Sequence, residues 1–216
     1  MHFHIITLFP ESIEAYMNSS IIGRARKDKR ITITFYNPRD FTRDKHKRVD
    51  RKPYGGGPGM VLEAGSILKA AEKALKGKRK TLVIFFSPRG DLFTNTHARA
   101  YAKKYKHIVF LCGHYEGIDA RVVRVLKAKR VSIGPYVLTG GELPAAVLID
   151  AISRQIPGVL GTFESLEEER VSGSEVYTRP EVLVHKKRKY RVPKVLLSGH
   201  HKKIEEWKKK KPSRHS

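Results

Sequence analysis

The chain of 216 residues carries 44 Lys and Arg against 21 Asp and Glu, which gives a formal net charge of +23. That length predicts one domain, or one domain with a small annex, and the strong positive charge indicates a polyanionic partner. The sequence has no apolar run of about 20 residues, no secretory signal pattern at its N-terminus and a single cysteine, Cys112. These features exclude a membrane span, an intrachain disulfide and a Cys-cluster zinc site, and they predict a cytoplasmic protein without a membrane partner.

Short β-branched runs alternate with amphipathic stretches along the first 150 or so residues. The patterns predict strands at 4–9, 31–36, 81–86, 107–112 and 130–133, and helices at 62–75, 94–105, 117–128 and 143–152. Strands that alternate with helices in this way are typical of a mostly parallel sheet covered on both faces. The sequence therefore predicts an α/β fold.

The character of the chain changes after Ile156-Pro157-Gly158. The next stretch is polar and acidic, and the part from Lys186 onward is rich in Lys and Arg, with a helical pattern over 200–210. We expect a main domain at 1–160, a linker at 161–176 and a small basic domain at 177–216. Trp207, set among lysines, either stacks on a nucleic acid base or packs within that small domain.

Three glycine-bearing turns, at 87–90, 113–117 and 133–142, each follow a predicted strand. In open α/β sheets, ligands bind just outside the carboxyl ends of the strands. Three such turns at neighbouring strand ends would form one pocket of backbone N–H and C=O groups, which suits an adenosine-type ligand. The alternative reading, three tight turns without a ligand, is the less favoured because the turns cluster in one half of the sheet.

A different glycine-rich loop, Arg51-Lys52-Pro53-Tyr54-Gly55-Gly56-Gly57-Pro58-Gly59-Met60, lacks the Walker A ending and the dinucleotide fingerprint. Its composition fits either close approach to a flat ligand or a flexible surface loop. The preceding strip, 39–52, holds seven Lys and Arg and is a candidate for phosphate contact or a solvated face. The histidines show no metal-ligand spacing, and the adjacent His200 and His201 cannot share one ion from one helix face. Cys112 is expected in the core. The sequence therefore predicts no metal site.

Six segments occur in a characteristic order: NPRDF at 37–41, RKPYGGGPGM at 51–60, GHYEGID at 113–119, SIGPYVLTGGELP at 132–144, SRQIPGVLG at 153–161 and YTRPEVL at 177–183. Together they closely resemble the bacterial TrmD family, the tRNA (guanine-N1)-methyltransferases of the SPOUT superfamily. The resemblance extends from residue 1 to about Trp207. Each motif is weak by itself, but the ordered set is specific.

The resemblance implies a deep trefoil knot in the sheet domain, a small, mainly helical C-terminal domain and an obligate homodimer whose active sites draw on both subunits. It implies transfer of a methyl group from S-adenosylmethionine to N1 of guanosine 37, just 3′ of the tRNA anticodon, which maintains the reading frame. Members of the family often need Mg²⁺.

The matching motifs also imply site residues. The methyl donor is expected at Phe86, Ser87, Pro88, Gly113, Tyr115, Glu116, Ile133, Gly134, Pro135, Tyr136, Val137, Leu138, Gly140, Gly141 and Pro144. The tRNA substrate is expected at Asp50, Tyr54, Gly55, Gly56, Gly57, Pro58, Gly59, Met60 and Arg179.

The family's active-site arginine matches Arg154, and its catalytic base is an aspartate in a Ser-x-x-Glu-Asp-Ser-Phe stretch. The matching residues 165–171 read Ser-Leu-Glu-Glu-Glu-Arg-Val, so Glu169 stands in place of that aspartate. Guanine N1 carries a proton, which a carboxylate can remove while a guanidinium stabilises the charge that develops on O6. Glu168 or Glu167 takes this role if the register shifts, and an acidic linker without a catalytic role is the alternative.

Two further functions remain open at this point. One is a SPOUT RNA methyltransferase with a different target nucleotide, and the other is a catalytically impaired relative that only binds RNA. The loop at 54–60 and the motif at 177–183 favour guanosine as the target. Three retained donor turns argue against a protein that only binds RNA.

Overall fold

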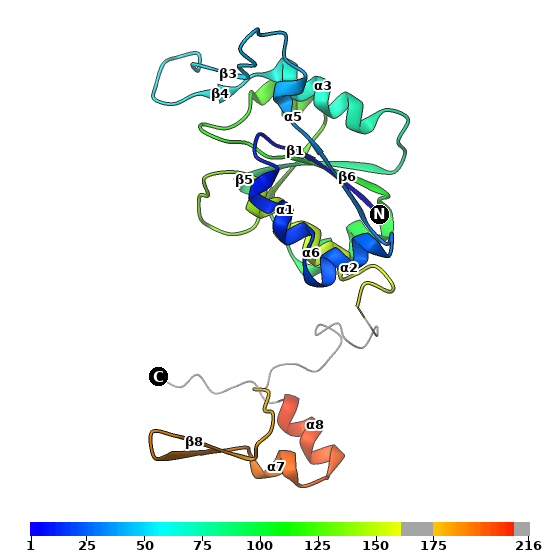
Figure 1. Cartoon of the computed structure of the whole chain (residues 1–216), viewed down its shortest axis with the longest axis vertical. Helices are drawn as coiled ribbons and strands as arrows, with labels where there is room; N and C mark the ends of the chain where they lie inside the picture. Colours follow the sequence, from blue (N-terminus) through cyan, green and yellow to red (C-terminus); the bar gives the residue numbers. More distant parts are fainter. Residues whose placement is uncertain (161–174, 210–216) are drawn as a thin grey trace. The chain divides into compact units, whose positions relative to one another are not determined.

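Figure 1 presents the computed structural model, which describes residues 1–160 and 175–209. The chain divides into two compact units, Met1–Leu160 and Gly161–Ser216, and each is described by itself. The predicted linker lies almost wholly outside the described residues, as do Glu167, Glu168 and Glu169. No helix in the described part of the chain combines the length and apolar character that a bilayer span requires.

A five-stranded sheet forms the centre of the first unit. Its spatial order is β2-β1-β6-β5-β7, and every neighbouring pair is parallel. The strands are β1 (His2–Ile6), β2 (Thr32–Tyr36), β5 (Thr81–Leu92), β6 (His107–Leu111) and β7 (Lys129–Ser132). The predicted α/β class with a mostly parallel sheet is thus confirmed.

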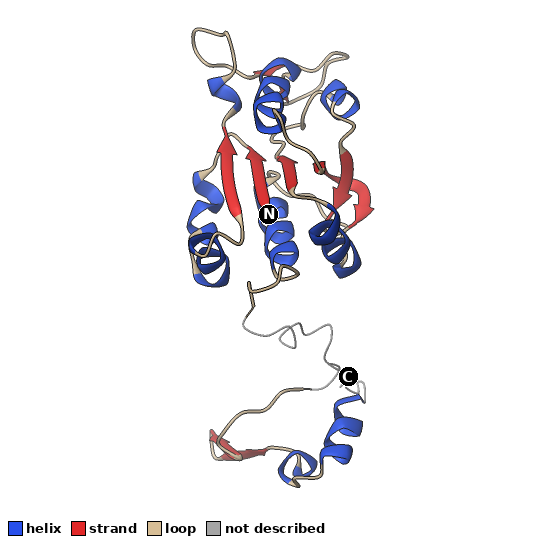
Figure 2. Ribbon diagram, turned by 90° about the vertical axis from the view of Figure 1, so that its right-hand side faces the viewer, coloured by secondary structure: helices blue, strands red, loops and turns tan. Residues whose placement is uncertain are grey.

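Helices cover both faces of this sheet (Figures 1 and 2), as alternating side chains of the strands require. Phe3 and Ile5 of β1 belong to one apolar cluster, and Ile6 belongs to the other. The first cluster takes in α1 (Glu11–Met17), α2 (Ser20–Lys27), α4 (Asn95–Lys104) and α6 (Glu142–Ser153). The second takes in α3 (Ala64–Leu75) and α5 (Ala120–Val125). The 3₁₀ turn η1 (Pro38–Asp40) overlaps the start of the basic strip at 39–52.

Strand β5 extends further than its apolar run predicts. The expected strand ends at 86, with a turn at 87–90, but β5 continues to Leu92. Phe86 and Asp91 both lie opposite Val131 of β7, so the four residues between them form an outward excursion in the strand. A Cβ at Gly90 would lie 2.6 Å from the backbone nitrogen of Val131, which is why glycine closes this excursion.

A two-stranded hairpin carries the glycine-rich loop. Its strands are β3 (Asp50–Arg51) and β4 (Val61–Leu62), which pair antiparallel. Asp50 lies opposite Leu62, and the loop at 52–60 projects from the pair. Gly55, Gly56, Gly57 and Gly59 all have positive φ, a conformation that other residues adopt at a cost.

The second unit combines a hairpin with two helices. Strands β8 (Val182–His185) and β9 (Arg188–Arg191) pair antiparallel and are followed by α7 (Lys194–Leu197) and α8 (His201–Lys209). The helical pattern at 200–210 corresponds to α8, whereas the hairpin was not predicted. The ring of Trp207 lies 6.2 Å from that of Tyr177, which favours packing within the small domain.

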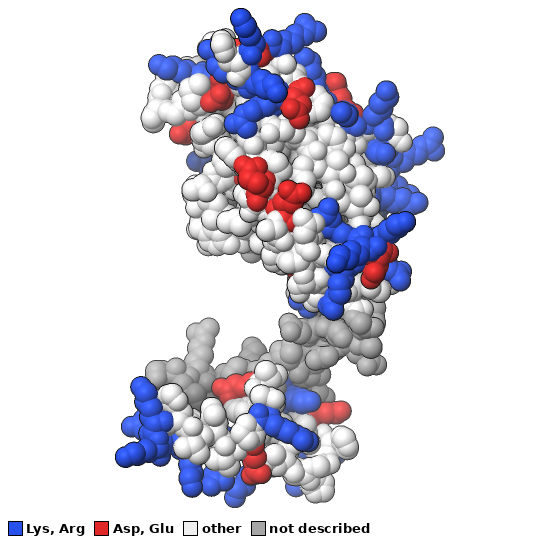
Figure 3. All heavy atoms as spheres, in the orientation of Figure 1, with Lys and Arg blue, Asp and Glu red and all other residues white. Residues whose placement is uncertain are grey.

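Lys and Arg cover much of the second unit and the end of the first unit that carries the basic strip (Figure 3). A broad area of the first unit in the same view carries few of them. The positive charge is therefore unevenly spread over the first unit.

Candidate active site

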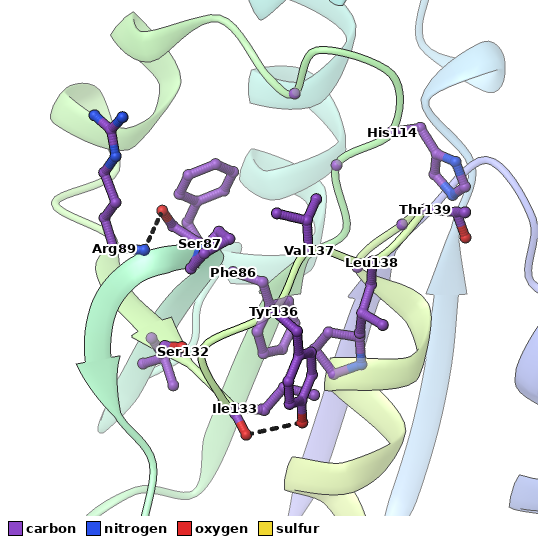
Figure 4. A pocket seen from close by; sticks show the side chains of 18 of the residues that line it. Phe86, Ser87, Arg89, His114, Ser132, Ile133, Tyr136, Val137, Leu138 and Thr139 are labelled. Carbon is purple, nitrogen blue, oxygen red and sulfur yellow. Dashed lines mark hydrogen bonds between the residues drawn. The ribbon is translucent and has the colours of Figure 1, made fainter.

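The three predicted turns meet at one end of the sheet. The first is the excursion within β5, and the other two follow β6 and β7; these strands are neighbours in the order β6-β5-β7. Together with the N-terminal end of α6 they enclose a cavity of about 540 Å³ (Figure 4). Of the predicted donor residues all but Pro135 line it: Phe86, Ser87, Pro88, Gly113, Tyr115, Glu116, Ile133, Gly134, Tyr136, Val137, Leu138, Gly140, Gly141 and Pro144.

The turn after β7 is stabilised by its own polar groups. The Tyr136 hydroxyl donates to the carbonyl of Ile133 at 3.0 Å (Figure 4), and the Ser132 hydroxyl donates to the carbonyl of Gly134 at 3.0 Å. The Tyr136 ring occupies the place of a Cβ at Gly134. This packing fixes the turn's backbone and leaves the Val137 side chain 82% exposed.

Glycines allow the start of α6 to approach the end of β6. The backbone nitrogen of Gly141 donates to the carbonyl of Gly113 at 3.0 Å. A Cβ at Gly141 would lie 2.5 Å from the Cα of Cys112, and one at Gly140 would collide with His114 and Glu142. Side chains at these two positions would push two walls of the cavity apart.

A buried carboxylate lies beneath this wall. Glu142 is only 5% exposed. Its Oε1 accepts a hydrogen bond from the Thr7 hydroxyl at 2.5 Å, and its Oε2 lies 2.7 Å from Nε2 of His114. The ring of Phe9 packs edge-on against His114 at 4.8 Å. These contacts fix the orientation of His114, which lines the cavity.

Sequence reasoning missed the lining residues Phe85, Val131 and Ser132, which precede the predicted turns. Arg89, His114, Gly117 and Thr139 also line the cavity; they belong to the three predicted turns but not to the donor residues that the resemblance implies. Glu142 and Thr7 carry no comparable signal, because only the packing of α6 against the segment after β1 brings them together.

The glycine-rich loop is anchored to the cavity at its base. The backbone nitrogen of Glu116 donates to the carbonyl of Met60 at 3.0 Å, and that of Leu62 donates to the carbonyl of Gly117 at 3.0 Å. A Cβ at Gly59 would lie 2.6 Å from Oε1 of Glu116. Met60 and Gly59 thus adjoin the pocket.

The remaining predicted substrate residues lie apart from that contact. Tyr54 is fully exposed, and no described atom outside the adjoining residues lies within 4 Å of a Cβ built on Gly55, Gly56 or Gly57. Pro58 is also exposed, and Asp50 lies in β3 at the base of the hairpin. Arg179 belongs to the second unit.

Arg154 lies far from the cavity of its own chain. It caps the C-terminal end of α6, whereas Pro144 near the other end lines the pocket. Ten residues of helix span about 15 Å at 1.5 Å per residue. Nε of Arg154 is buried and has no hydrogen-bond partner among the described residues. Such a donor needs a partner from elsewhere.

The thiol of Cys112 is not suited to act as a nucleophile. Cys112 is buried, and burial raises the pKa of its thiol well above the usual value, with the charge of Glu142 adding to the shift. A neutral thiol is a poor nucleophile. The core position expected for Cys112 is thus confirmed.

Comparison with known proteins identifies the family. The family model described as tRNA (Guanine-1)-methyltransferase TrmD matches residues 1–216. The chain is similar to proteins named tRNA (guanine-N(1)-)-methyltransferase from several bacteria. It is 47% identical to that of Carboxydothermus hydrogenoformans over 97% of this chain and 82% of the relative. It is 48% identical to that of Lachnospira eligens (98% and 89%) and 44% identical to that of Clostridioides difficile (99% and 93%).

Proposed function

The chain belongs to the TrmD family of tRNA (guanine-1)-methyltransferases, and we propose that it methylates N1 of guanosine 37, just 3′ of the anticodon, using S-adenosylmethionine. The observation that carries the proposal is the cavity between the β5 excursion and the ends of β6 and β7, which gathers nearly all the residues expected to hold the donor. A tRNA substrate accounts for the net charge of +23 and makes the cytoplasm the proposed place of action.

The cavity fits a nucleoside donor. Its walls are largely turn backbone, which can hydrogen-bond an adenine and a ribose. Gly140, Gly141 and Gly113 keep the walls free of side chains, and the Ser87–Gly90 excursion closes one side. When bound, S-adenosylmethionine supplies an activated methyl group on its sulfonium sulfur, which leaves as a neutral thioether.

The protein's part in the reaction is to prepare the guanine. In our proposal the carboxylate of Glu169, at about 2.6–3.2 Å from N1, takes the N1 proton. Arg154 offers its guanidinium to O6, where negative charge develops. Arg154 is partly exposed although its Nε is buried, so the terminal nitrogens of the guanidinium would make this contact.

We propose that the active site combines two copies of the chain. Arg154 and the cavity lie at opposite ends of α6, so one chain cannot bring both to one guanine. The exposed face of α6 carries Leu143 and Val147, at 58% and 47% exposed, one helical turn apart. An apolar strip of this kind fits an interface with a second copy.

Mixing two inactive variants tests this arrangement. Gly141→Ala damages the cavity and Arg154→Ala removes the guanidinium, so each homodimer should be inactive. After subunit exchange, a mixed dimer holds one complete site, and random mixing should restore about one quarter of the wild-type activity. If the mixture stays inactive although mixed dimers form, the site is not shared in this way.

The knot and the small domain are part of the same proposal. The packing of residues 140–141 against 112–114 supports a knot, because the chain after β7 passes close to the turn after β6. The described part of the second unit presents Lys and Arg on its hairpin and helices, which supports contact with the tRNA backbone (Figure 3). The need for Mg²⁺ that the resemblance implies stays a prediction; among the described residues no group of three or more carboxylates offers a site for it.

The decisive experiment incubates the purified protein and labelled S-adenosylmethionine with tRNA transcripts that carry or lack guanosine 37. We expect label only in the transcripts that carry it, at N1 of that base. Label in both transcripts would favour an RNA methyltransferase with another target. Donor binding without transfer would favour the catalytically impaired alternative, and no donor binding at all would overturn the assignment of the cavity.

A further inference from the structure

Three histidines gather at the opposite end of the sheet from the cavity. His2 and His4 alternate along β1 and therefore point to the same face, while His107 of β6 lies opposite His2 in the parallel register. One ring nitrogen from each histidine lies within 4.8 Å of those of the other two. The start of β1 is marked by the N-terminus in Figure 1.

We propose that His2, His4 and His107 bind a Zn²⁺ ion, or a related late transition-metal ion, which bridges β1 and β6. The sequence pattern did not predict this site, because His2 and His4 are two positions apart and their partner lies far along the chain. The proposal rests on the position, hydrogen bonding and chemistry of the three rings.

The spacing of the rings is close to what zinc requires. Zn–N bonds of about 2.0–2.1 Å in a tetrahedral site place two ligand nitrogens about 3.3–3.4 Å apart. Nε2 of His4 and Nδ1 of His107 already lie 3.2 Å apart. His2 stacks on His4 with ring centroids 3.9 Å apart, and both His2 and His107 are partly exposed, so their rings can turn toward a shared ion.

Hydroxyl groups on the neighbouring strand orient two of the rings. Nδ1 of His4 lies 3.1 Å from the Tyr36 hydroxyl, and Nε2 of His2 lies 2.8 Å from Oγ1 of Thr34. Metal-binding histidines usually use the second ring nitrogen for a hydrogen bond of this kind. Each of these bonds anchors one nitrogen. The other nitrogen of His4 hydrogen-bonds Nδ1 of His107, and the proposed ion would replace that bond.

The chemistry of the cluster selects the metal. Imidazole nitrogen without carboxylate suits Zn²⁺, Ni²⁺ or Cu²⁺, whereas Mg²⁺ and Ca²⁺ prefer oxygen. The charges of Lys78, Lys106 and the Met1 amine face the cluster and oppose a cation, so we expect weaker binding than in a closed structural zinc site.

The proposed ion would act on stability and not on methyl transfer. Five residues of strand, about 16 Å, separate the cluster from the turn at 113–117. An ion held by β1 and β6 would fasten two strands that are distant in sequence. It should therefore raise the melting temperature and leave donor binding unchanged.

The test uses full-length protein freed of any affinity tag and treated with a chelator. Zn²⁺ binding is measured by competition with a chromophoric chelator, and the visible spectrum of bound Co²⁺ reports the ligand geometry. We expect one Zn²⁺ bound per chain, a metal-induced rise in melting temperature and no competition from excess Mg²⁺. The double variant His2→Gln/His107→Gln should bind Zn²⁺ at least 10-fold more weakly and lose the rise.

The matched control is His200→Gln/His201→Gln, which removes two exposed histidines of the second unit and should bind Zn²⁺ as the wild type does. The single variant His2→Gln, at a partly exposed position, provides a second comparison if the double variant folds poorly. Absence of stoichiometric binding to the wild type would overturn the proposal. So would a loss of less than 10-fold in the foldable cluster variants, or an equal loss in the control.

Discussion

Gly141→Ala should damage the donor cavity far more than its single added methyl group suggests. The new Cβ would lie 2.5 Å from the Cα of Cys112, 3.0 Å from its Cβ and 3.1 Å from the backbone nitrogen of Gly113. Ordinary contacts begin near 3.4 Å, so the start of α6 and the end of β6 must separate by about 1 Å. Both are backbone segments, so no side-chain rotation relieves the contact.

The expected magnitudes follow from that separation. Overpacking of this size costs about 1–3 kcal/mol, which lowers the melting temperature by about 2–12 °C in a chain of this length. The hydrogen bond from Gly141 to the carbonyl of Gly113 stretches as well. Displacement of a catalytic wall by about 1 Å can reduce turnover roughly 100-fold, and we expect at least a 10-fold loss of donor affinity.

The assay is calorimetric titration with S-adenosylmethionine alongside thermal unfolding. Gly65→Ala in α3 is the matched control, because no described atom outside its helix and chain neighbours lies within 4 Å of a Cβ built there. That change should leave donor binding intact and raise stability by up to about 1 kcal/mol. Wild-type donor affinity in Gly141→Ala would refute the link between this close approach and the donor site.

Further predictions concern methyl transfer, the thiol of Cys112 and the small basic domain. Arg154→Ala should abolish methyl transfer while donor titration stays near wild type, and equal activity in variant and wild type would remove its role. Glu169→Gln should lower single-turnover rates far more than Glu167→Gln, and the reverse ranking would reassign the base. Cys112, whose pKa is raised by burial, should resist thiol reagents at pH 8 until the protein unfolds; rapid labelling of the native protein would contradict this. Truncation after Pro193 should weaken the salt dependence of tRNA affinity. The slope of log K against log salt concentration should become shallower by about 0.9 for each phosphate contact that is lost. An unchanged slope would show that the removed residues do not contact phosphate.

Much of the fold of the first unit could be read from periodicity. The apolar runs at 81–86 and 107–112 identify β5 and β6, and the spacing at 143–152 identifies α6, because each is buried on a regular pattern. The three turns also indicated a shared pocket, since parallel strands end at one edge. Local patterns suffice where burial alone determines the structure.

Other features depend on contacts that the sequence does not display. The β8–β9 hairpin was missed because nearly all of its side chains are exposed, so no apolar alternation marks it. The excursion in β5 is defined by Phe86 and Asp91 sharing one partner on β7. Pro135 belongs to the expected motif yet does not line the cavity, because a motif says nothing about which way each residue of a turn faces.

The sheet order has a consequence for how the chain reaches this structure. Strand β6 inserts between β1 and β5, and His4 of β1 contacts His107, 103 positions along the chain. A nascent chain can pair β1 with β2 early, but the other edge of β1 waits until β6 has left the ribosome. Pairings of such long range make folding slow, so newly made chains should pass through a state with an open strand edge that chaperones could recognise.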